Sequence, residues 1–170
     1  IKPLPESARL LLSELTLSDA PFMLTLLNSE GWLKYIGDRN VKTVEQARQY
    51  LKNNTIKSYK ESGFGFYKVT LKSINQPVGI AGFVKRPQLE HEDLGFAFLP
   101  EFQGLGLGYE AAKLIMQYAQ DQLKLPKFTA IVQPNNVKSI KLLQKLGMQF
   151  EKTVNPFNEA QPLMLFSIHF

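Results

Sequence analysis

A run of closely spaced glycines is the part of the chain best suited to bind an anion. It reads Leu99-Pro-Glu-Phe-Gln-Gly-Leu-Gly-Leu-Gly108-Tyr-Glu-Ala-Ala112 and lies between an apolar segment and an amphipathic one. Glycine lets the backbone approach a ligand closely, and a following helix begins with free N–H groups and the positive end of its dipole. Together these features predict a site for a pyrophosphate group.

Three phosphate-binding patterns can be compared with this run. A Walker loop needs Lys and then Ser or Thr straight after its last glycine, but Gly108 is followed by Tyr109 and Glu110. A dinucleotide fingerprint needs a third glycine at the position where Tyr109 stands, and it opens a βαβ unit rather than following three strands. The pattern that remains is Gln-x-x-Gly-x-Gly, which Gln103, Gly106 and Gly108 satisfy. A glycine-rich turn into a core helix is the structural alternative.

The segments around this loop predict a mixed α/β domain. Alternating apolar and β-branched residues predict strands over 10–17, 64–71, 77–85, 93–99, 128–132, 148–154 and 163–170. Helical spacing predicts helices that begin at Ser18, after Thr43 with Gln46 as its capping-box partner, after the glycine loop, and at Asn135 or Asn136. The predicted order is β-α-α-β-β-β-α-β-α-β-β, in a single domain over residues 1–170.

Composition limits the class of protein. The chain has 170 residues, of which 44% are hydrophobic and 21% charged, which is typical of a globular domain. It has no cysteine, which excludes disulfides and a cysteine nucleophile, and His91 and His169 are too few for a histidine-rich metal site, so we expect no metal. No apolar run approaches the ~20 residues of a membrane helix, and no signal-peptide pattern is visible. We therefore expect a cytoplasmic protein without a membrane partner.

The charge balance is mildly basic. Twenty Lys and Arg against fifteen Asp and Glu give a net charge of +5. This favours an anionic partner such as a phosphate-bearing cofactor, an acidic substrate or RNA, while a lysine-rich solvated surface is the alternative. The lysines are scattered, so a nucleic-acid-binding tail is not indicated.

The glycine loop resembles the coenzyme A pyrophosphate loop of the GNAT superfamily of N-acetyltransferases, and three other segments support this resemblance. The segment from Asn136 to Met148 is similar to the Asn-x-x-Ser…Lys-x-Gly-Phe helix of that superfamily, with Met148 in place of Phe. Ile36-Gly-Asp-Arg39 and Asp93-Leu-Gly-Phe-Ala-Phe-Leu-Pro100 resemble segments of its ribosomal-protein-alanine acetyltransferase (RimJ/RimL-like) branch. The resemblance runs from about residue 9 to the C-terminus. It implies the GNAT fold with a splayed central strand pair.

The resemblance also implies which residues hold acetyl-CoA, the expected cosubstrate. Backbone groups of Phe96 and Phe98 would pair with the pantetheine arm, and backbone N–H groups of the loop would hold the pyrophosphate. Asn136 would hydrogen-bond the pantetheine, and Ser139 would lie near the thioester sulfur. Helix capping is the alternative for these two residues. The implied loop residues are Gln103, Gly104, Leu105, Gly106, Gly108 and Tyr109.

The implied reaction is attack of a neutral amine on the thioester, which needs a general base and no covalent enzyme intermediate. Glu92 and Asp93 stand at the start of the strand that leads to the pantetheine. Consecutive strand residues point to opposite faces, so at most one of them faces the site. The RimL-like branch has its acidic residue at Asp93, whereas counting to the loop favours Glu92. A solvated hairpin charge is the alternative for both.

Two catalytic positions of relatives are changed in this chain. Ile131 stands where some relatives have a base Glu, and Leu143 stands where many have a general-acid Tyr. Ser139 is therefore the remaining polar candidate for assisting the leaving thiolate.

The acceptor amine is the part of the function that the sequence specifies least. The resemblance places Trp32, Tyr35 and Asp38 at the acceptor groove, together with the last strand pair and residues 155–158; core packing is the alternative for the two aromatic residues. An N-terminal α-amine has a pKa near 7.7–8.0 against ~10.4 for lysine, so it needs a weaker base. We therefore expect a protein N-terminus, a ribosomal protein among them, or a small-molecule amine of low pKa.

Two other classes of function stay open on the sequence. A protein of the same fold could hold coenzyme A without chemistry, since the Tyr is missing and the base is not fixed. An RNA-associated basic protein is supported only by the net charge. We expect a monomer or a homodimer.

Overall fold

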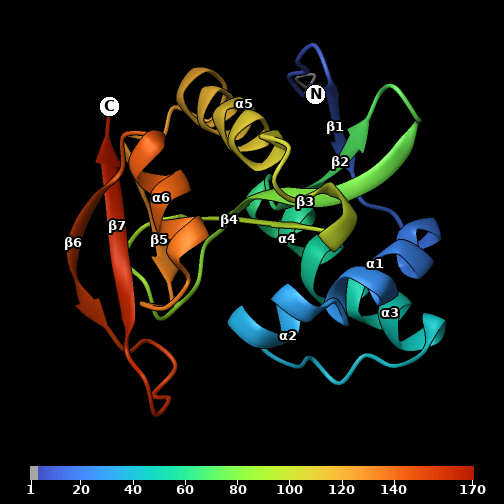
Figure 1. Ribbon diagram of the computed structural model, residues 1–170, viewed down its shortest axis with the longest axis horizontal. Coiled ribbons are helices and arrows are strands. Elements are labelled where there is room, and N and C mark those ends of the chain that lie inside the picture. The colour runs from blue at the N-terminus through green and yellow to red at the C-terminus, as the bar shows by residue number, and fades with distance from the viewer. Residues whose placement is uncertain (1–3) are drawn as a thin grey trace.

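The computed structural model describes residues 4–170 as a seven-stranded sheet with helices on both faces (Figure 1). The strands are β1 (Leu10–Glu14), β2 (Phe66–Leu71), β3 (Gln76–Val84), β4 (Asp93–Phe98), β5 (Lys127–Val132), β6 (Gln149–Val154) and β7 (Leu163–His169). The helices are α1 (Ala20–Leu27), α2 (Glu30–Tyr35), α3 (Val44–Tyr50), α4 (Lys57–Ser62), α5 (Leu107–Asp121) and α6 (Val137–Lys145). Short 3-10 turns are η1 (Leu17–Asp19) and η3 (Pro100–Phe102), and a π-helical segment is η2 (Leu51–Ile56).

The centre of the sheet is splayed. The strand order is β1-β2-β3-β4-β5-β7-β6, and β4 and β5 are the parallel neighbours. Their register is limited to Asp93 opposite Thr129, where the Thr129 N–H donates to the Glu92 carbonyl at 2.8 Å. Beyond this pair the two strands separate toward their carboxyl ends. The mixed α/β fold and the splayed central pair predicted from the sequence are thus confirmed.

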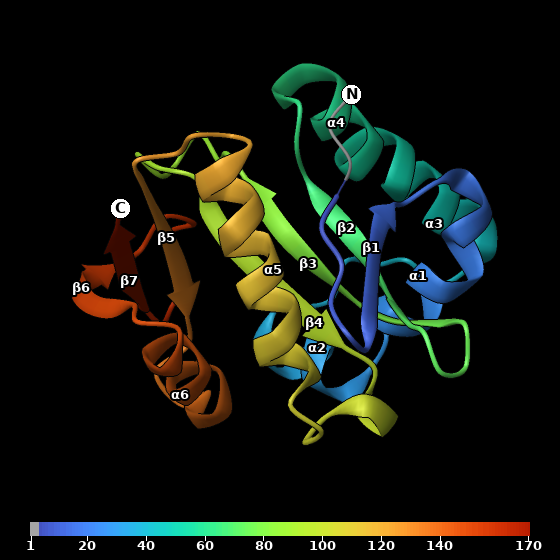
Figure 2. The same ribbon diagram turned by 90° about the horizontal axis from the view of Figure 1, so that it is seen from above.

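Each face of the sheet has its own hydrophobic core. Figure 2 shows α5 and α6 on one face, where α5 packs against β1, β3 and β4, and α6 packs against β5. Ala111, Ile115 and Ala119 of α5 are fully buried there, because their small or branched side chains let the helix lie close to the strands. The opposite core gathers side chains of α1, α2 and α3 over Ile80. Helix α5 therefore packs into one hydrophobic core, and α1, α2 and α3 pack into another.

The N-terminal third differs from its predicted elements. The first strand ends at Glu14 because the next amide, of Leu15, donates to the Tyr59 hydroxyl at 3.0 Å. Thr16, rather than Ser18, then caps the turn that leads into α1. The short helix α2 was not predicted. Within residues 4–170, no helix is both long and apolar enough to cross a membrane.

The predicted helix after Thr43 is present but is not a regular α-helix. Its capping box is formed as predicted, since the Gln46 N–H donates to the Thr43 hydroxyl at 3.1 Å. The helix then continues through α3, the π-helical η2 and α4 to Ser62. Segments of π-helix occur frequently at functional sites. Here η2 brings Asn53 and Asn54 to the wall of the cavity described below.

Candidate active site

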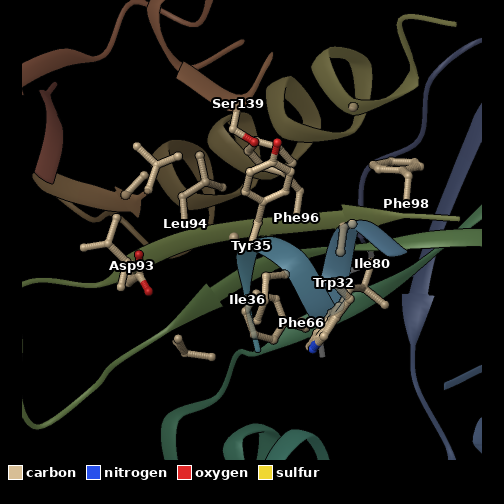
Figure 3. Close-up of a pocket in the computed structure, with 18 of the residues that line it drawn as sticks. Trp32, Tyr35, Ile36, Phe66, Ile80, Asp93, Leu94, Phe96, Phe98 and Ser139 are labelled. Carbon is tan, nitrogen blue, oxygen red and sulfur yellow. The ribbon is translucent and has the colours of Figure 1, made fainter. Parts of the chain in front are cut away.

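A cavity of about 1260 Å³ opens where β4 and β5 separate. It runs from the glycine loop, past the side of β4 that faces β5, to α2 and the β3–β4 loop. Figure 3 shows side chains on both sides of β4: Leu94, Phe96 and Ser139 on one side, and Ile36 and Phe66 on the other. One continuous space therefore joins the two regions that the sequence predicts for cofactor and acceptor.

The glycine loop presents a row of backbone amides. Gly104 and Gly106 have φ angles of 77° and 79°, which L side chains rarely adopt. Among residues 4–170, no group accepts a hydrogen bond from the amides of Gly104, Leu105 or Gly106, and no side chain caps α5. The first amides of α5 lack helical partners by geometry. The amides from Gly104 to Tyr109 thus form a concave, electropositive surface suited to an anion.

Arg9, from the chain just before β1, braces this loop. Its Nη1 donates to the Leu105 carbonyl at 3.1 Å, and its Nε donates to Glu110 Oε1 at 2.8 Å. Burial opposes ionisation of Glu110, but hydrogen bonds from Ser7 and Arg9 outweigh it and hold the pKa of that carboxyl below its usual range. The role of Arg9 could not be predicted from the sequence, because its contacts lie about 100 positions away in the chain.

The side chain of Gln103 supports the loop. Its Nε2 donates to the Phe98 carbonyl at 3.0 Å, so it ties the loop to the end of β4. Gly108 has a packing role: a Cβ there would lie 3.1 Å from Leu142 Cδ1 of α6. Gln103 and Gly108 therefore support the shape of the loop through packing and a side-chain hydrogen bond. The groups available to an anion are the backbone amides from Gly104 to Tyr109.

The hydrogen-bond register shows which groups of β4 face the splay. The Leu99 N–H donates to the Val78 carbonyl of β3 at 2.9 Å, and pairing between β3 and β4 is regular. In an antiparallel ladder alternate residues bond to the partner strand, so the backbone groups of Leu94, Phe96 and Phe98 point the other way, toward β5. The Phe98 carbonyl accepts a hydrogen bond from the Gln103 side chain. The Phe98 N–H and the N–H and carbonyl of Phe96 therefore remain available on the side of β4 that faces β5.

The start of α6 forms the far wall of the cofactor side. Asn136 Oδ1 accepts the Ser139 N–H at 3.4 Å, so its oxygen caps α6 while its Nδ2 stays available. Ser139 is half-buried and lines the cavity, as does Tyr109. The ammonium groups of Lys145 and Lys113 lie 4.2 and 5.6 Å from the centre of the Tyr109 ring, so positive charge lies beside the amide row.

The structure separates the two candidate bases. Asp93 lines the cavity and is only 3% exposed, whereas the side chain of Glu92 is not part of the cavity wall. Asp93 Oδ2 accepts from Arg86 Nε at 2.8 Å, and Oδ1 is buried without a partner among the described residues. Burial raises the pKa of Asp93 to about 6, against the lowering effects of the Arg86 charge and hydrogen bond and of the Ile131 backbone amide. A carboxylate in this state can accept a proton near neutral pH.

The acceptor side has aromatic and apolar walls. Trp32 is 7% exposed and packs in the core, while Tyr35 and Ile36 project into the cavity (Figure 3). Phe66 lies directly against β4 because Gly95 has no side chain: a Cβ there would be 2.7 Å from Phe66 Cε1. The Trp32 indole N–H is also buried without a partner among the described residues. The sequence did not reveal Phe66 as a wall residue.

Asp38 is not a base candidate in this geometry. Its carboxylate pairs with Lys42 at 3.2 Å on the surface and lies outside the cavity wall. A hydrogen bond from the Asn40 amide, with help from Lys42, lowers the pKa of Asp38. Gln133, after β5, instead fixes this region by donating from Nε2 to the Tyr35 carbonyl at 3.1 Å. Along the described chain, no three His, Asp or Glu side chains gather as a metal site would require.

Comparison with known proteins identifies the family. The family model of the acetyltransferase (GNAT) domain matches residues 9–149. The uncharacterized N-acetyltransferase YnaD of Bacillus subtilis is 27% identical over 155 residues, which cover 89% of this chain and 88% of YnaD. RimL, a ribosomal-protein alpha-N-acetyltransferase solved with coenzyme A, superposes with a TM-score of 0.84 at 16% identity, covering 99% of this chain and 98% of RimL. Spermidine N-acetyltransferase from Vibrio cholerae, solved with coenzyme A and spermine, gives 0.79 at 17% identity, with 96% of each chain covered.

The family model matches most of the chain, and the relatives and solved structures agree with it over nearly the full length. The observed splay of β4 from β5 and the amide row at the glycine loop are consistent with this match. The chain therefore belongs to the GNAT family of acetyltransferases and is an acyltransferase.

Proposed function

We propose that this enzyme transfers the acetyl group of acetyl-CoA to a single primary amine, with Asp93 as the general base. The observation that carries the proposal is the cavity itself: it is lined by a row of open amides at one end and, at the other, by Asp93, whose buried Oδ1 has no partner of normal geometry among the described residues. Few structural roles would explain both features in one space, because an orphaned buried oxygen costs free energy unless a ligand satisfies it.

The residues present fit acetyl-CoA. The amides from Gly104 to Tyr109 suit its pyrophosphate, and the available groups of Phe96 and Phe98 can pair with the amides of the pantetheine arm as an added strand would. Asn136 Nδ2 can donate to the same arm. When bound, acetyl-CoA supplies a thioester carbonyl at the end of this arm. The N–H groups of β4 that face the splay are suited to stabilise the developing oxyanion.

Asp93 is suited to take the proton from the amine. Among the described residues, no group makes a hydrogen bond of normal geometry to its Oδ1, and a pKa of about 6 leaves the carboxylate mostly ionised at neutral pH yet still basic. Direct transfer needs no covalent enzyme intermediate, and the chain has no cysteine to form one.

Ser139 is the proposed donor to the leaving thiolate. We expect Ser139→Ala to lower kcat about 10- to 150-fold and to leave KM for acetyl-CoA unchanged, since one hydrogen bond to a charged group is worth about 1.5–3 kcal/mol. Rapid-quench kinetics with saturating acetyl-CoA measures this. Ser139→Thr, which keeps a hydroxyl, should retain most of the rate. An Ala variant as fast as wild type removes Ser139 from the mechanism.

The acceptor that fits best is a single amine of low pKa, such as a protein N-terminal α-amine. The acceptor end has apolar walls from Ile36, Phe66 and Ile80, and its buried carboxylate is already paired with Arg86. A polyamine keeps several ammonium groups, and each would need a carboxylate to compensate its lost hydration. A ribosomal protein is one possible source of such an N-terminus.

A panel of amines tests the proposal. We expect thiol release from acetyl-CoA at pH 7 to be faster with N-terminal peptides than with spermidine or with N-α-blocked lysine, because more of the α-amine is neutral. Peptides with a blocked N-terminus are the matched control. Faster turnover on spermidine or on the lysine side chain overturns the acceptor assignment. Binding of acetyl-CoA with no thiol release on any amine would instead indicate a coenzyme A-binding module.

A further inference from the structure

Arg86 joins three elements at the acceptor end of the cavity. It lies in the β3–β4 loop, its Nε donates to Asp93 Oδ2 at 2.8 Å, and its guanidinium carbon lies 5.5 Å from the centre of the Phe157 ring. Phe157 belongs to the β6–β7 loop, so one side chain connects the start of β4 with two loops. Arg86 is about one-third exposed, while Asp93 beneath it is almost fully buried.

Both loops around Arg86 are internally fixed. In the β6–β7 loop, Asn155 Nδ2 donates to the Glu159 carbonyl at 2.9 Å, and the Glu159 N–H donates back to Asn155 Oδ1 at 3.0 Å. In the β3–β4 loop, Lys85 Nζ donates to the carbonyls of Arg86 and Leu89. The guanidinium is thus held between a carboxylate and an aromatic face, a geometry that its planar, always charged group favours.

We propose that Arg86 is a positioning residue for catalysis: it binds Oδ2 of Asp93, favours the ionised carboxylate, and leaves Oδ1 without a side-chain partner that would compete for the proton of the acceptor amine. The inference rests on the proposed function of Asp93. Its basis is the asymmetry of the carboxylate, in which Oδ2 is bound by Arg86 and Oδ1 is unpartnered in the described chain. Bidentate pairing, the common arrangement for Arg and a carboxylate, would have occupied both oxygens.

Within residues 4–170, no other charged group near Asp93 replaces Arg86 in this role. The Lys85 ammonium donates its hydrogen bonds to the backbone carbonyls of Arg86 and Leu89. Arg39 and Glu159 line the cavity but form no ion pair with Asp93. Glu92 is the adjacent residue on the opposite face of β4. Across the sheet, β5 contributes the uncharged Thr129 and Ile131 near this point. Burial raises the pKa of Asp93, and Arg86 is the cation that opposes this effect.

Arg86→Met tests the proposal, because it keeps an unbranched side chain about as long as the arginine stem and removes the charged guanidinium. The pKa of the Asp93 carboxyl, followed by carbon-detected NMR titration of the ligand-free protein, should rise by about one to two units. The acidic limb of kcat/KM should move upward by the same amount, with activity at pH 7 reduced about two- to tenfold and recovering at higher pH. KM for acetyl-CoA should stay constant.

Two variants serve as controls. Arg48→Met makes the same substitution at a surface ion pair with Glu45, outside the cavity, and should leave both titrations unchanged. Arg86→Lys keeps the charge and should restore the pH profile in part. An Asp93 pKa that does not move in folded Arg86→Met overturns the inference. A pKa that moves while the pH profile does not shows instead that Asp93 is not the base.

Discussion

Asp93→Asn is expected to lower kcat/KM for the acceptor amine by about 10²–10⁴-fold, the usual range for loss of a general base. The substitution keeps the size of the side chain and its bond from Arg86, so acetyl-CoA affinity measured by calorimetry should not change. Glu92→Gln is the matched control from the neighbouring position, and it should retain nearly full activity because its side chain lies outside the cavity wall.

The pH dependence of kcat/KM is a second test of Asp93 as the general base. Since the pKa of Asp93 is raised to about 6, the base is ionised above that pH, and wild-type kcat/KM should fall as the pH drops through 6. A peptide α-amine adds a separate rise near pH 8 from its own deprotonation. In Asp93→Asn only the second rise should remain. A variant that keeps the limb near pH 6 at full rate would place the base elsewhere.

Gly106→Asp is expected to weaken acetyl-CoA binding by at least 100-fold. Gly106 has a φ of 79° and lies in the middle of the amide row, so a carboxylate there would repel the pyrophosphate and compete for its amides. Calorimetric titration with acetyl-CoA measures the change.

Gly106→Asn is the matched control, because Asn and Asp tolerate a left-handed backbone about equally and differ in charge. A Cβ at this position would lie 3.5 Å from Arg9 Nη2, which already binds Glu110, and both variants share that contact. We expect Gly106→Asn to lose much less affinity than Gly106→Asp. Equal affinities for the two folded variants would show that the pyrophosphate does not lie at this loop.

The cofactor side could be predicted from the sequence because its features are local. Glycines at 104 and 106, a following helix and the Asn136 cap each follow from a short stretch of residues, and the structure places all of them on one cavity. The contribution of Gln103 could not be predicted in the same way. Its bond to the Phe98 carbonyl depends on how η3 folds the loop back onto β4.

The acceptor end of the cavity is formed by contacts between segments that are distant in the chain. Its general location could be predicted from the sequence, but most of its residues could not. Strand alternation showed that either Glu92 or Asp93 faces the site, but the choice requires the register with β3. Arg86 sits in a loop with no motif, and its stacking on Phe157 joins positions 71 apart in the chain. Helix α2 was not predicted because it has only six residues, too few to show a helical repeat, and one of them is Gly31, which disfavours a helix.

The helix after Thr43 shows a third kind of limit. Its start follows from a capping box, and its total extent follows from apolar spacing, but nothing in Leu51–Ile56 signals a π-helix. Such a segment is set by tertiary packing, here of the buried Leu51 within the core that α1, α2 and α3 form over Ile80.

The most direct test of the central claim measures both products of one reaction. Wild-type protein, acetyl-CoA and an N-terminal peptide are mixed at pH 7, and free thiol and acetylated peptide are quantified over time by absorbance and mass spectrometry. Direct transfer through this cavity predicts one thiol per acetylated α-amine, with both rates falling together in Asp93→Asn. Bound acetyl-CoA with neither product on any amine, or thiol release without acetylated amine, would contradict it.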